Sequence, residues 1–159
     1  MKILLTGSSK GIGFNFANTL INEGHDIALH YNKNKSALDT LLKDSKTNSF
    51  TIQSDLSDSS QVKDLVNNTI DKLSFPDCII NNAGITQDNL AIRMNLDEWK
   101  KVIDINLTST FLLSKFAIKK MLKNKAGKII NITSVVGHTG NLGQTERLTK
   151  IKHGTESHM

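Results

Sequence analysis

The sequence has one cysteine and no long apolar run, and both scarcities limit where the protein can work. A single cysteine, Cys78, excludes an internal disulfide and suits a reducing compartment. Near its start, the sequence has three apolar residues (3–5) before the first glycine. This run is too short for the apolar core of a secretory signal peptide. No later run reaches the length that spans a membrane. We therefore expect a cytoplasmic protein with no membrane partner, or an organelle-matrix protein if a transit peptide has been removed.

Aromatic residues and arginine are also scarce, although the chain is basic. The net charge is +5, and the aromatic residues are six Phe, one Trp and one Tyr. A nucleic-acid-binding surface needs clustered basic residues beside aromatic side chains that stack on bases. The lysines are instead spread along the predicted helices. The sequence therefore favours a solvated basic surface over a nucleic-acid partner.

Apolar runs alternate with helical patterns along residues 1–144, which is typical of a parallel α/β sheet. One helical face ends at Gly24, a second begins at Asp58, and a long helix runs from Asn95, with Glu98 in capping-box position, to Lys123. The five short apolar runs between helices predict strands at residues 2–6, 26–31, 49–53, 77–81 and 128–133.

A glycine-rich loop joins the first predicted strand to the first helix. It reads Thr6-Gly7-Ser8-Ser9-Lys10-Gly11-Ile12-Gly13. The three glycines allow a tight turn and let backbone N–H groups approach a pyrophosphate at the N-terminus of the following helix. Because the loop lies between a strand and an amphipathic helix, the sequence favours a dinucleotide site over an ordinary strand–helix turn.

The T-G-x-x-x-G-I-G spacing of this loop resembles the short-chain dehydrogenase/reductase family, and residues 81–84 (Asn-Asn-Ala-Gly) resemble that family's second motif. The resemblance implies an α/β, Rossmann-like, doubly wound parallel sheet with strand order 3-2-1-4-5, lacking the last two strands of the family. Asp55 matches the family's adenine-contacting aspartate, with a helix cap as the alternative interpretation. The implied cofactor-binding residues are Gly7, Ser9, Lys10, Gly11, Ile12, Gly13, Asp55, Asn82, Ala83 and Gly84.

The choice between nicotinamide cofactors is predicted from charge. A site that prefers NAD usually has an acidic residue after the second strand, where it holds the ribose 2′-hydroxyl. Residues 30–35 contain no carboxylate, and Lys10 in the glycine loop could meet a 2′-phosphate. The sequence therefore favours NADP(H) over NAD(H). Lys33 and Lys35 either contribute to that preference or are solvated loop charges.

Residues 81–94, 97–99 and 134–144 resemble the 3-oxoacyl-[acyl-carrier-protein] reductases within the family. The resemblance implies NADPH-dependent reduction of a β-keto group carried on acyl carrier protein, in fatty-acid biosynthesis. Such a reduction needs a hydrogen-bond donor on the carbonyl oxygen and a general acid. Ser134 matches the family's carbonyl-binding serine, and Asn106 matches the asparagine that holds a water relay. No metal site is predicted.

The positions of the family's catalytic tyrosine and lysine hold Arg147 and Ile151. An arginine stays protonated and donates a proton poorly, and an isoleucine cannot lower a neighbour's pKa. The one tyrosine, Tyr31, falls at the adenosine end of the implied site. His138 is an alternative acid near Ser134, but a place in the loop that lines the substrate cleft is the favoured interpretation.

The sequence changes character after Gln144, because residues 145–159 hold three apolar residues spaced for neither a helix nor a strand. We expect an incomplete NADP(H)-binding domain at 1–144 and a divergent, disordered tail at 145–159, produced by a frameshift or a gene-prediction error. The chain would then be an inactive or weakly active fragment, and whether it is an enzyme stays open. The alternative is a non-catalytic NADP(H)-binding protein that pairs with an intact paralogue.

The resemblance also implies two kinds of protein partner. The first is a homo-oligomer assembled through the helix 96–123. The second is acyl carrier protein, an acidic protein that a group of lysines before the fifth strand could attract. A solvated helix end, whose lysines suit the helix dipole, is the alternative interpretation. The group comprises Lys119, Lys120, Lys123, Lys125 and Lys128.

Overall fold

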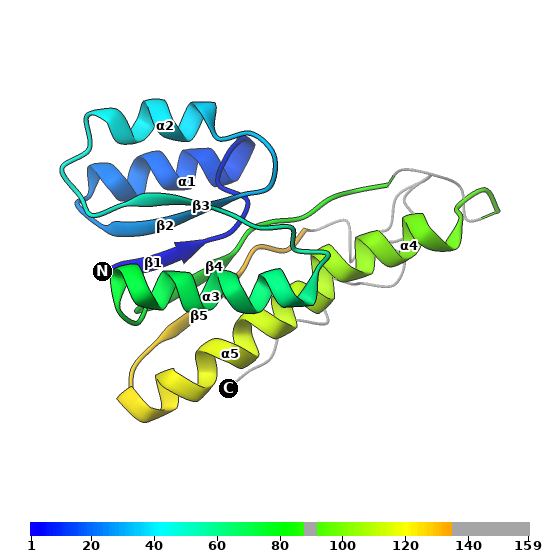
Figure 1. The fold of residues 1–159 in the computed structure, drawn as a ribbon. Helices are drawn as coiled ribbons and strands as arrows, with labels where there is room; N and C mark the ends of the chain where they lie inside the picture. Colours follow the sequence, from blue (N-terminus) through cyan, green and yellow to red (C-terminus); the bar gives the residue numbers. More distant parts are fainter. Residues whose placement is uncertain (88–91, 135–159) are drawn as a thin grey trace.

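The computed structural model describes residues 1–87 and 92–134, and these residues form a parallel sheet with helices on both faces (Figure 1). The strand order is β3-β2-β1-β4-β5, and each neighbouring pair is parallel. This order confirms the predicted Rossmann-like fold. The strands are β1 (Lys2–Leu5), β2 (Asp26–Tyr31), β3 (Phe50–Gln53), β4 (Cys78–Asn81) and β5 (Lys128–Asn131). All five lie within the predicted runs, and differ from them only by one or two residues at an end.

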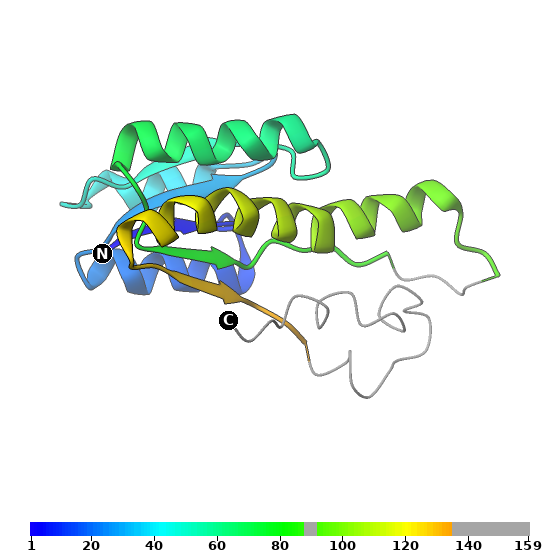
Figure 2. The same cartoon turned by 90° about the horizontal axis from the view of Figure 1, so that it is seen from below.

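Two helical layers cover the sheet (Figures 1 and 2). The helices α1 (Gly11–Asn22) and α2 (Ser36–Lys43) lie on one face. The helix α3 (Ser59–Leu73) and the long helix that ends in α5 (Ser109–Asn124) lie on the other. Sequence prediction missed α2, which has eight residues and buries only Leu38 completely.

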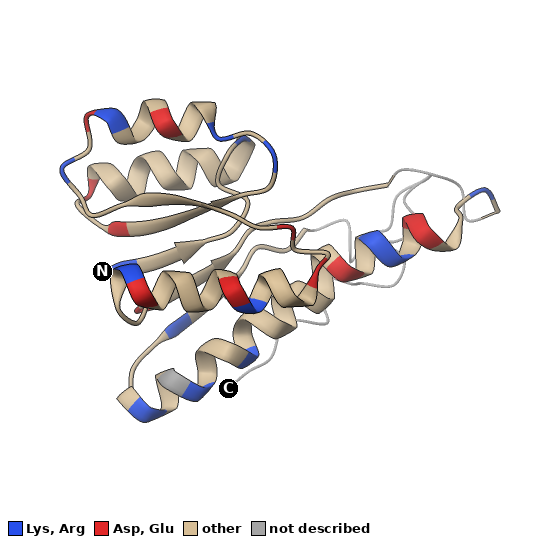
Figure 3. Cartoon of the chain, in the orientation of Figure 1, with Lys and Arg blue, Asp and Glu red and all other residues tan. Residues whose placement is uncertain are grey.

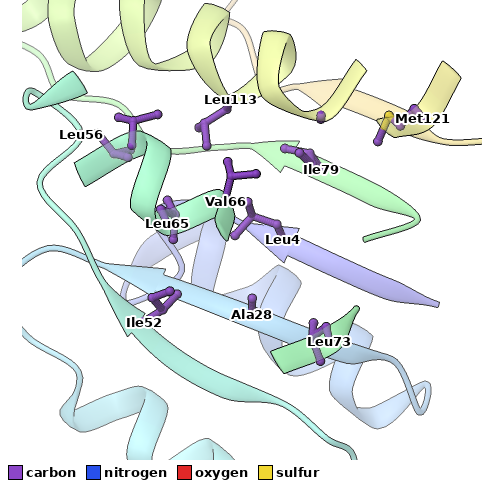
Figure 4. Packing of buried hydrophobic residues seen from close by; sticks show 12 residues of the cluster. Leu4, Ala28, Ile52, Leu56, Leu65, Val66, Leu73, Ile79, Leu113 and Met121 are labelled. Atoms are coloured by element: carbon purple, nitrogen blue, oxygen red, sulfur yellow. The ribbon is translucent and has the colours of Figure 1, made fainter. Parts of the chain in front are cut away.

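The core forms because side chains on a strand alternate between faces. Leu4 of β1 packs towards α3 and α5, whereas Ile3 and Leu5 pack towards α1 and α2. On the first face, Leu4 and Ile79 of the sheet pack in one cluster with Val66 of α3 and Leu113 of α5 (Figure 4). Both faces are apolar, as expected for a parallel sheet buried on two sides.

The long helix begins and ends close to the predicted residues, but its middle differs. It comprises α4 (Leu96–Ile103), a π-helical turn η1 (Asp104–Thr108) and α5. Asn95 and Glu98 form the predicted capping box, which is confirmed. The sequence predicted the long helix but not the π-helical turn at residues 104–108, where Asn106 lies. The α4 end extends beyond the sheet (Figure 1). Within residues 1–87 and 92–134, no helix combines the length and apolarity needed to cross a bilayer.

Candidate functional site

The predicted cofactor residues gather at the edge of the sheet where the parallel strands end. Such an edge is where ligands bind in open α/β sheets. The segment after β1 carries Gly7 to Gly13, the segment after β3 carries Asp55, and the segment after β4 carries Asn82 to Gly84. The structure therefore brings together the three sequence segments that the prediction named.

The glycine loop packs so closely on its surroundings that two of its glycines leave no room for a side chain. A Cβ atom at Gly7, whose φ is +66°, would lie 2.7 Å from the Cα atom of Ala83. A Cβ atom at Gly13 would collide with the Gly7 carbonyl oxygen and lie 2.5 Å from Asn82 Nδ2. The loop and the Asn82–Ala83 segment are thus in direct backbone contact.

The N-terminus of α1 has features that fit a phosphate group. Lys10 is the N-cap residue, makes no side-chain cap hydrogen bond, and no acidic residue lies in the first turn. By contrast, α3 is capped by Asp58 and α4 by Asn95. The first N–H groups of a helix have no partner within it, and a bound anion commonly accepts from them. Ile12, in the first turn of α1, is 61% exposed, so this helix end is open to solvent.

Thr6 and Asn82 hold the second motif against the glycine loop. The Asn82 side chain donates from Nδ2 to the carbonyl oxygens of Thr6 and Gly7, at 3.0 and 3.1 Å. The backbone N–H groups of Asn82 and Ala83 both donate to Thr6 Oγ1, at 3.1 and 3.0 Å. Gly84, the next residue, is exposed. Thr6 was absent from the predicted site residues. The sequence feature that could have indicated it is a polar residue directly after the apolar run 3–5.

Asp55 is held by local hydrogen bonds. Its Oδ1 accepts from the Ser57 backbone N–H at 2.9 Å and from Ser57 Oγ at 2.7 Å. These bonds, together with the charge of Lys101, hold the pKa of the Asp55 carboxyl below its ordinary value. The helix-cap alternative for Asp55 is wrong, because the residue that caps α3 is Asp58.

The lysines considered for a 2′-phosphate differ in their surroundings. Lys10 and Lys33 are exposed, whereas Lys35 forms an ion pair with Asp39 at 3.4 Å (Figure 3 shows the charged positions). Both side chains of that pair are half exposed, so it contributes little to stability. The preference for NADP(H) stays a prediction.

Asn106 is fixed by a reciprocal pair of hydrogen bonds. Its Oδ1 accepts from the Ile85 N–H at 2.9 Å, and its Nδ2 donates to the Ile85 carbonyl oxygen at 2.8 Å. The residue is 7% exposed and lies in the π-helical turn, a distortion that is frequent at functional sites. Asn106 therefore fastens the long helix to the segment directly after Asn82–Gly84.

Ser134 follows β5 by three residues and is half-buried, at the same edge of the sheet. At the ends of the two strands, Asn81 Nδ2 of β4 donates a 2.8 Å hydrogen bond to Asn131 Oδ1 of β5. Tyr31 ends β2, three strand positions from β5, which corresponds to about 14 Å at the usual strand spacing. Tyr31 is therefore too far from Ser134 to donate a proton beside it.

Arg147, Ile151 and His138 lie outside the described residues, as does the predicted tail 145–159. Within residues 1–87 and 92–134, no group of three or more His, Cys, Asp or Glu side chains could hold a metal ion.

Comparison with known proteins agrees with this arrangement. The family model described as short chain dehydrogenase matches residues 1–146. The chain belongs to the short-chain dehydrogenase family. The chain is 42% identical over 144 residues to a 3-oxoacyl-[acyl-carrier-protein] reductase of Synechocystis, and 40% and 38% identical to proteins of the same name from Staphylococcus aureus and Staphylococcus epidermidis. Each match covers 89% of this chain but only 58% or 59% of the relative.

Proposed function

We propose that the chain is the cofactor-binding part of a 3-oxoacyl-[acyl-carrier-protein] reductase and that it binds NADP(H) at the start of α1. The observation that carries this proposal is the uncapped, exposed N-terminus of α1 beneath a glycine loop that leaves no space for side chains at Gly7 and Gly13. A pyrophosphate would accept from the first N–H groups of α1, as in other Rossmann-type sites. The names of the relatives support the same assignment.

The proposed cofactor-binding residues contact different parts of the nucleotide. Gly11, Ile12 and Gly13 bind the pyrophosphate through the backbone, with Ser9 beside it, and Lys10 meets the 2′-phosphate. Ala83 and Gly84 line the ribose side, where Asn82 fixes them to the loop. Asp55 would accept from the adenine amino group through its second carboxylate oxygen.

The catalytic half would be only partly present. Bound NADPH supplies the hydride for a carbonyl carbon. Ser134 would donate a hydrogen bond to the carbonyl oxygen, and Asn106 would position the neighbouring segment and a water relay. Arg147 and Ile151 cannot supply or tune a proton at pH 7. We expect a rate on the order of a hundred- to ten-thousand-fold below that of a complete site, because this is what a positioned general acid contributes.

The division of the chain follows from the same proposal. Residues 1–144 would form an incomplete NADP(H)-binding domain of a cytoplasmic protein, and residues 145–159 a divergent tail created by a frameshift. Translation of the other reading frames downstream of codon 144 tests this origin. We expect a Tyr-x-x-x-Lys motif in another frame. If no frame encodes this motif, the frameshift origin is wrong.

Titration of the purified chain with NADPH and NADH tests cofactor binding. We expect NADPH to bind more tightly, and Lys10→Ala to weaken NADPH while leaving NADH unchanged. Lys43→Ala is the matched control, because Lys43 is exposed at the end of α2, at the opposite edge of the sheet. Equal loss of both nucleotides in Lys10→Ala would contradict the role in 2′-phosphate binding. Absence of binding to either nucleotide would refute the proposed function.

A second candidate is a non-catalytic NADP(H)-binding protein that pairs with another copy or an intact paralogue. Large apolar side chains on the long helix favour it: Leu96, Phe111 and Leu122 are 63%, 57% and 73% exposed. Light scattering of the purified chain distinguishes the cases. A discrete dimer or tetramer that Phe111→Lys dissociates supports pairing through helix 96–123, and a monomer with measurable NADPH affinity argues against a homo-oligomer.

Acyl carrier protein is the proposed macromolecular partner. Lys119, Lys123, Lys125 and Lys128 are exposed around the C-terminus of α5 and the start of β5. Their shared positive charge would attract an acidic protein and speed its association.

A further inference from the structure

We propose that His30 is a positioning residue for the nucleotide: its neutral imidazole holds the backbone of Gly7, so that protonation of the ring releases the glycine loop and weakens binding. The proposal rests on the nucleotide site described above and assigns a role to a side chain that is not itself expected to contact the ligand.

His30 lies where three strand ends meet. It is the fifth residue of β2, the strand that lies between β1 and β3, and is 3% exposed. The Gly7 N–H, just after β1, lies 3.0 Å from its Nδ1, and the Ser54 carbonyl oxygen, just after β3, lies 3.0 Å from its Nε2. The His30 carbonyl oxygen accepts from both the backbone N–H and the hydroxyl of Ser8, each at 2.9 Å. One residue thus holds two consecutive residues of the glycine loop.

These partners require one protonation state of the ring. A backbone N–H can only donate, so Nδ1 must accept from Gly7. A carbonyl oxygen can only accept, so Nε2 must carry the hydrogen that Ser54 receives. The neutral Nε2–H tautomer is the one state that satisfies both contacts. A proton on Nδ1 would place two donors against each other and leave the Gly7 N–H without its acceptor.

Displacement of Gly7 would disturb the phosphate site directly. The Gly7 carbonyl oxygen accepts from Asn82 Nδ2 at 3.1 Å and lies against Gly13 in the first turn of α1. The loop therefore cannot shift at Gly7 without moving the start of α1 or the Asn82 side chain. This chain of contacts links the ring to the N–H groups that would bind the pyrophosphate.

The surroundings of the ring favour its neutral state. Burial lowers the pKa of His30, and this effect outweighs the hydrogen bond to Ser54 and the charge of Asp55, both of which raise it. The charged side chains on the segments that surround the ring are Asp55 after β3, Asp58 at the start of α3 and Lys10 in the glycine loop. The Asp58 carboxylate is already held by Ser60 and Gln61.

The sign of the pH effect follows. The folded protein holds the ring neutral at pH 7, and takes up a proton only below the ordinary histidine pKa. Nucleotide affinity should therefore be constant from pH 8 to pH 7 and fall as the pH decreases towards 5. The 2′-phosphate of NADP⁺ also titrates near pH 6, so the ligand adds its own dependence, which a ratio between variants cancels.

Two substitutions separate the contacts of the ring. His30→Asn places an amide oxygen near the position of Nδ1, where it can still accept from Gly7 but cannot titrate. His30→Gln places an amide near the position of Nε2, where it can donate to Ser54 but leaves the Gly7 N–H unpaired. His25→Asn is the control, because His25 lies at the opposite edge of the sheet, before β2.

The experiment is calorimetric titration of the full chain with NADP⁺ at pH 8, 7, 6 and 5, with circular dichroism to establish that each variant is folded. The affinity of wild type relative to His30→Asn should be about one at pH 8 and should fall as the pH decreases below the ordinary histidine pKa, towards a loss on the order of tenfold once the ring is protonated, the effect expected when one amide loses its partner. His30→Gln should bind on the order of tenfold more weakly than wild type at pH 8. His25→Asn should follow the wild-type profile.

Parallel profiles for wild type and His30→Asn, or wild-type affinity in a folded His30→Gln, would overturn the proposal. Hydrogen exchange of residues 6–13 without nucleotide provides a readout that does not depend on binding. Faster exchange in His30→Gln than in His30→Asn supports the role, and equal protection refutes it. If the wild-type chain does not bind NADP⁺ at pH 8, the proposed function fails, while the exchange comparison still decides the role of His30.

Discussion

Replacement of Gly13 by alanine should be among the most damaging single changes in the glycine loop. The added methyl group would collide with the Gly7 carbonyl oxygen and lie 2.5 Å from Asn82 Nδ2, a distance that real Cβ contacts do not reach. Gly7 is fixed by His30 and Ala83, so the start of α1 must shift away from the Gly7 carbonyl oxygen, and the second clash displaces the Asn82 side chain as well. Its departure breaks the hydrogen bonds to the carbonyl oxygens of Thr6 and Gly7.

The magnitude can be worked from these two effects. Forcing a methyl group into a packed site costs about 1–3 kcal/mol. Loss of two hydrogen bonds costs about 1 kcal/mol each. The sum predicts a decrease of about 3–5 kcal/mol in the free energy of unfolding, or roughly 10 °C in Tm for a domain of this size.

Gly11→Ala is the matched control, because it adds the same methyl group in the same loop where no atom lies within 4 Å. Gly11 has a φ of +55°, so an alanine there costs about 1–2 kcal/mol through the left-handed backbone alone. Urea titration monitored by circular dichroism measures both variants. A Gly13→Ala protein within 1 kcal/mol of wild type, or less destabilised than Gly11→Ala, would refute the packing argument.

Three further predictions concern the rest of the chain. Asn106→Ala should lower the free energy of unfolding by about 2–3 kcal/mol, because both Ile85 backbone groups lose their partners; an unchanged urea midpoint would contradict the clamp. The pKa of Asp58 is lowered to about 2 by Ser60 and Gln61, so its contribution to stability is present above pH 4 and is lost as the pH falls towards 2. Asp58→Asn, which keeps the cap without the charge, should flatten that part of the pH–stability curve, and an identical curve would exclude Asp58 as its source. The double variant Lys123→Glu/Lys125→Glu should weaken binding to acyl carrier protein at least tenfold at low salt, and equal affinities in a surface-binding assay would favour the solvated-helix-end interpretation.

Local patterns predicted most of the fold because three of the five strands, β1, β2 and β4, are buried along most of their length and read as continuous apolar runs. The fourth strand was predicted at residues 77–81, and β4 begins one residue later, at Cys78. The capping-box pair Asn95 and Glu98 correctly predicted the start of the long helix, since Asn95 is the N-cap residue of α4. The missed helix, α2, carries Leu38, Leu41 and Leu42 at helical spacing on the core, but it has only eight residues, and so short a pattern is hard to tell from a loop.

The features that sequence analysis missed depend on contacts between distant segments. The π-helical turn at Asn106 accompanies two hydrogen bonds to Ile85, and no periodicity in residues 95–123 carries information about that partner. The role of His30 likewise depends on the pairing of β2 with both β1 and β3, which places Gly7 and Ser54 on either side of the ring. The sequence shows only a histidine within an apolar strand, and this pattern is equally typical of a histidine that belongs to the core.

The order of the strands shows how the proposed cofactor half could fold without a complete catalytic half. Every contact described around the glycine loop joins residues between Thr6 and Ala83, which are supplied by the first four strands. Ser134, in contrast, follows β5, which pairs only with β4 among the described strands, and Ile130 of β5 is 43% exposed. A strand held on one side is easier to open than one held on both, so the substrate half has less support than the nucleotide half. Hydrogen exchange should therefore be slower in β1 than in β5, and the affinity for nucleotide should depend little on substitutions after residue 128.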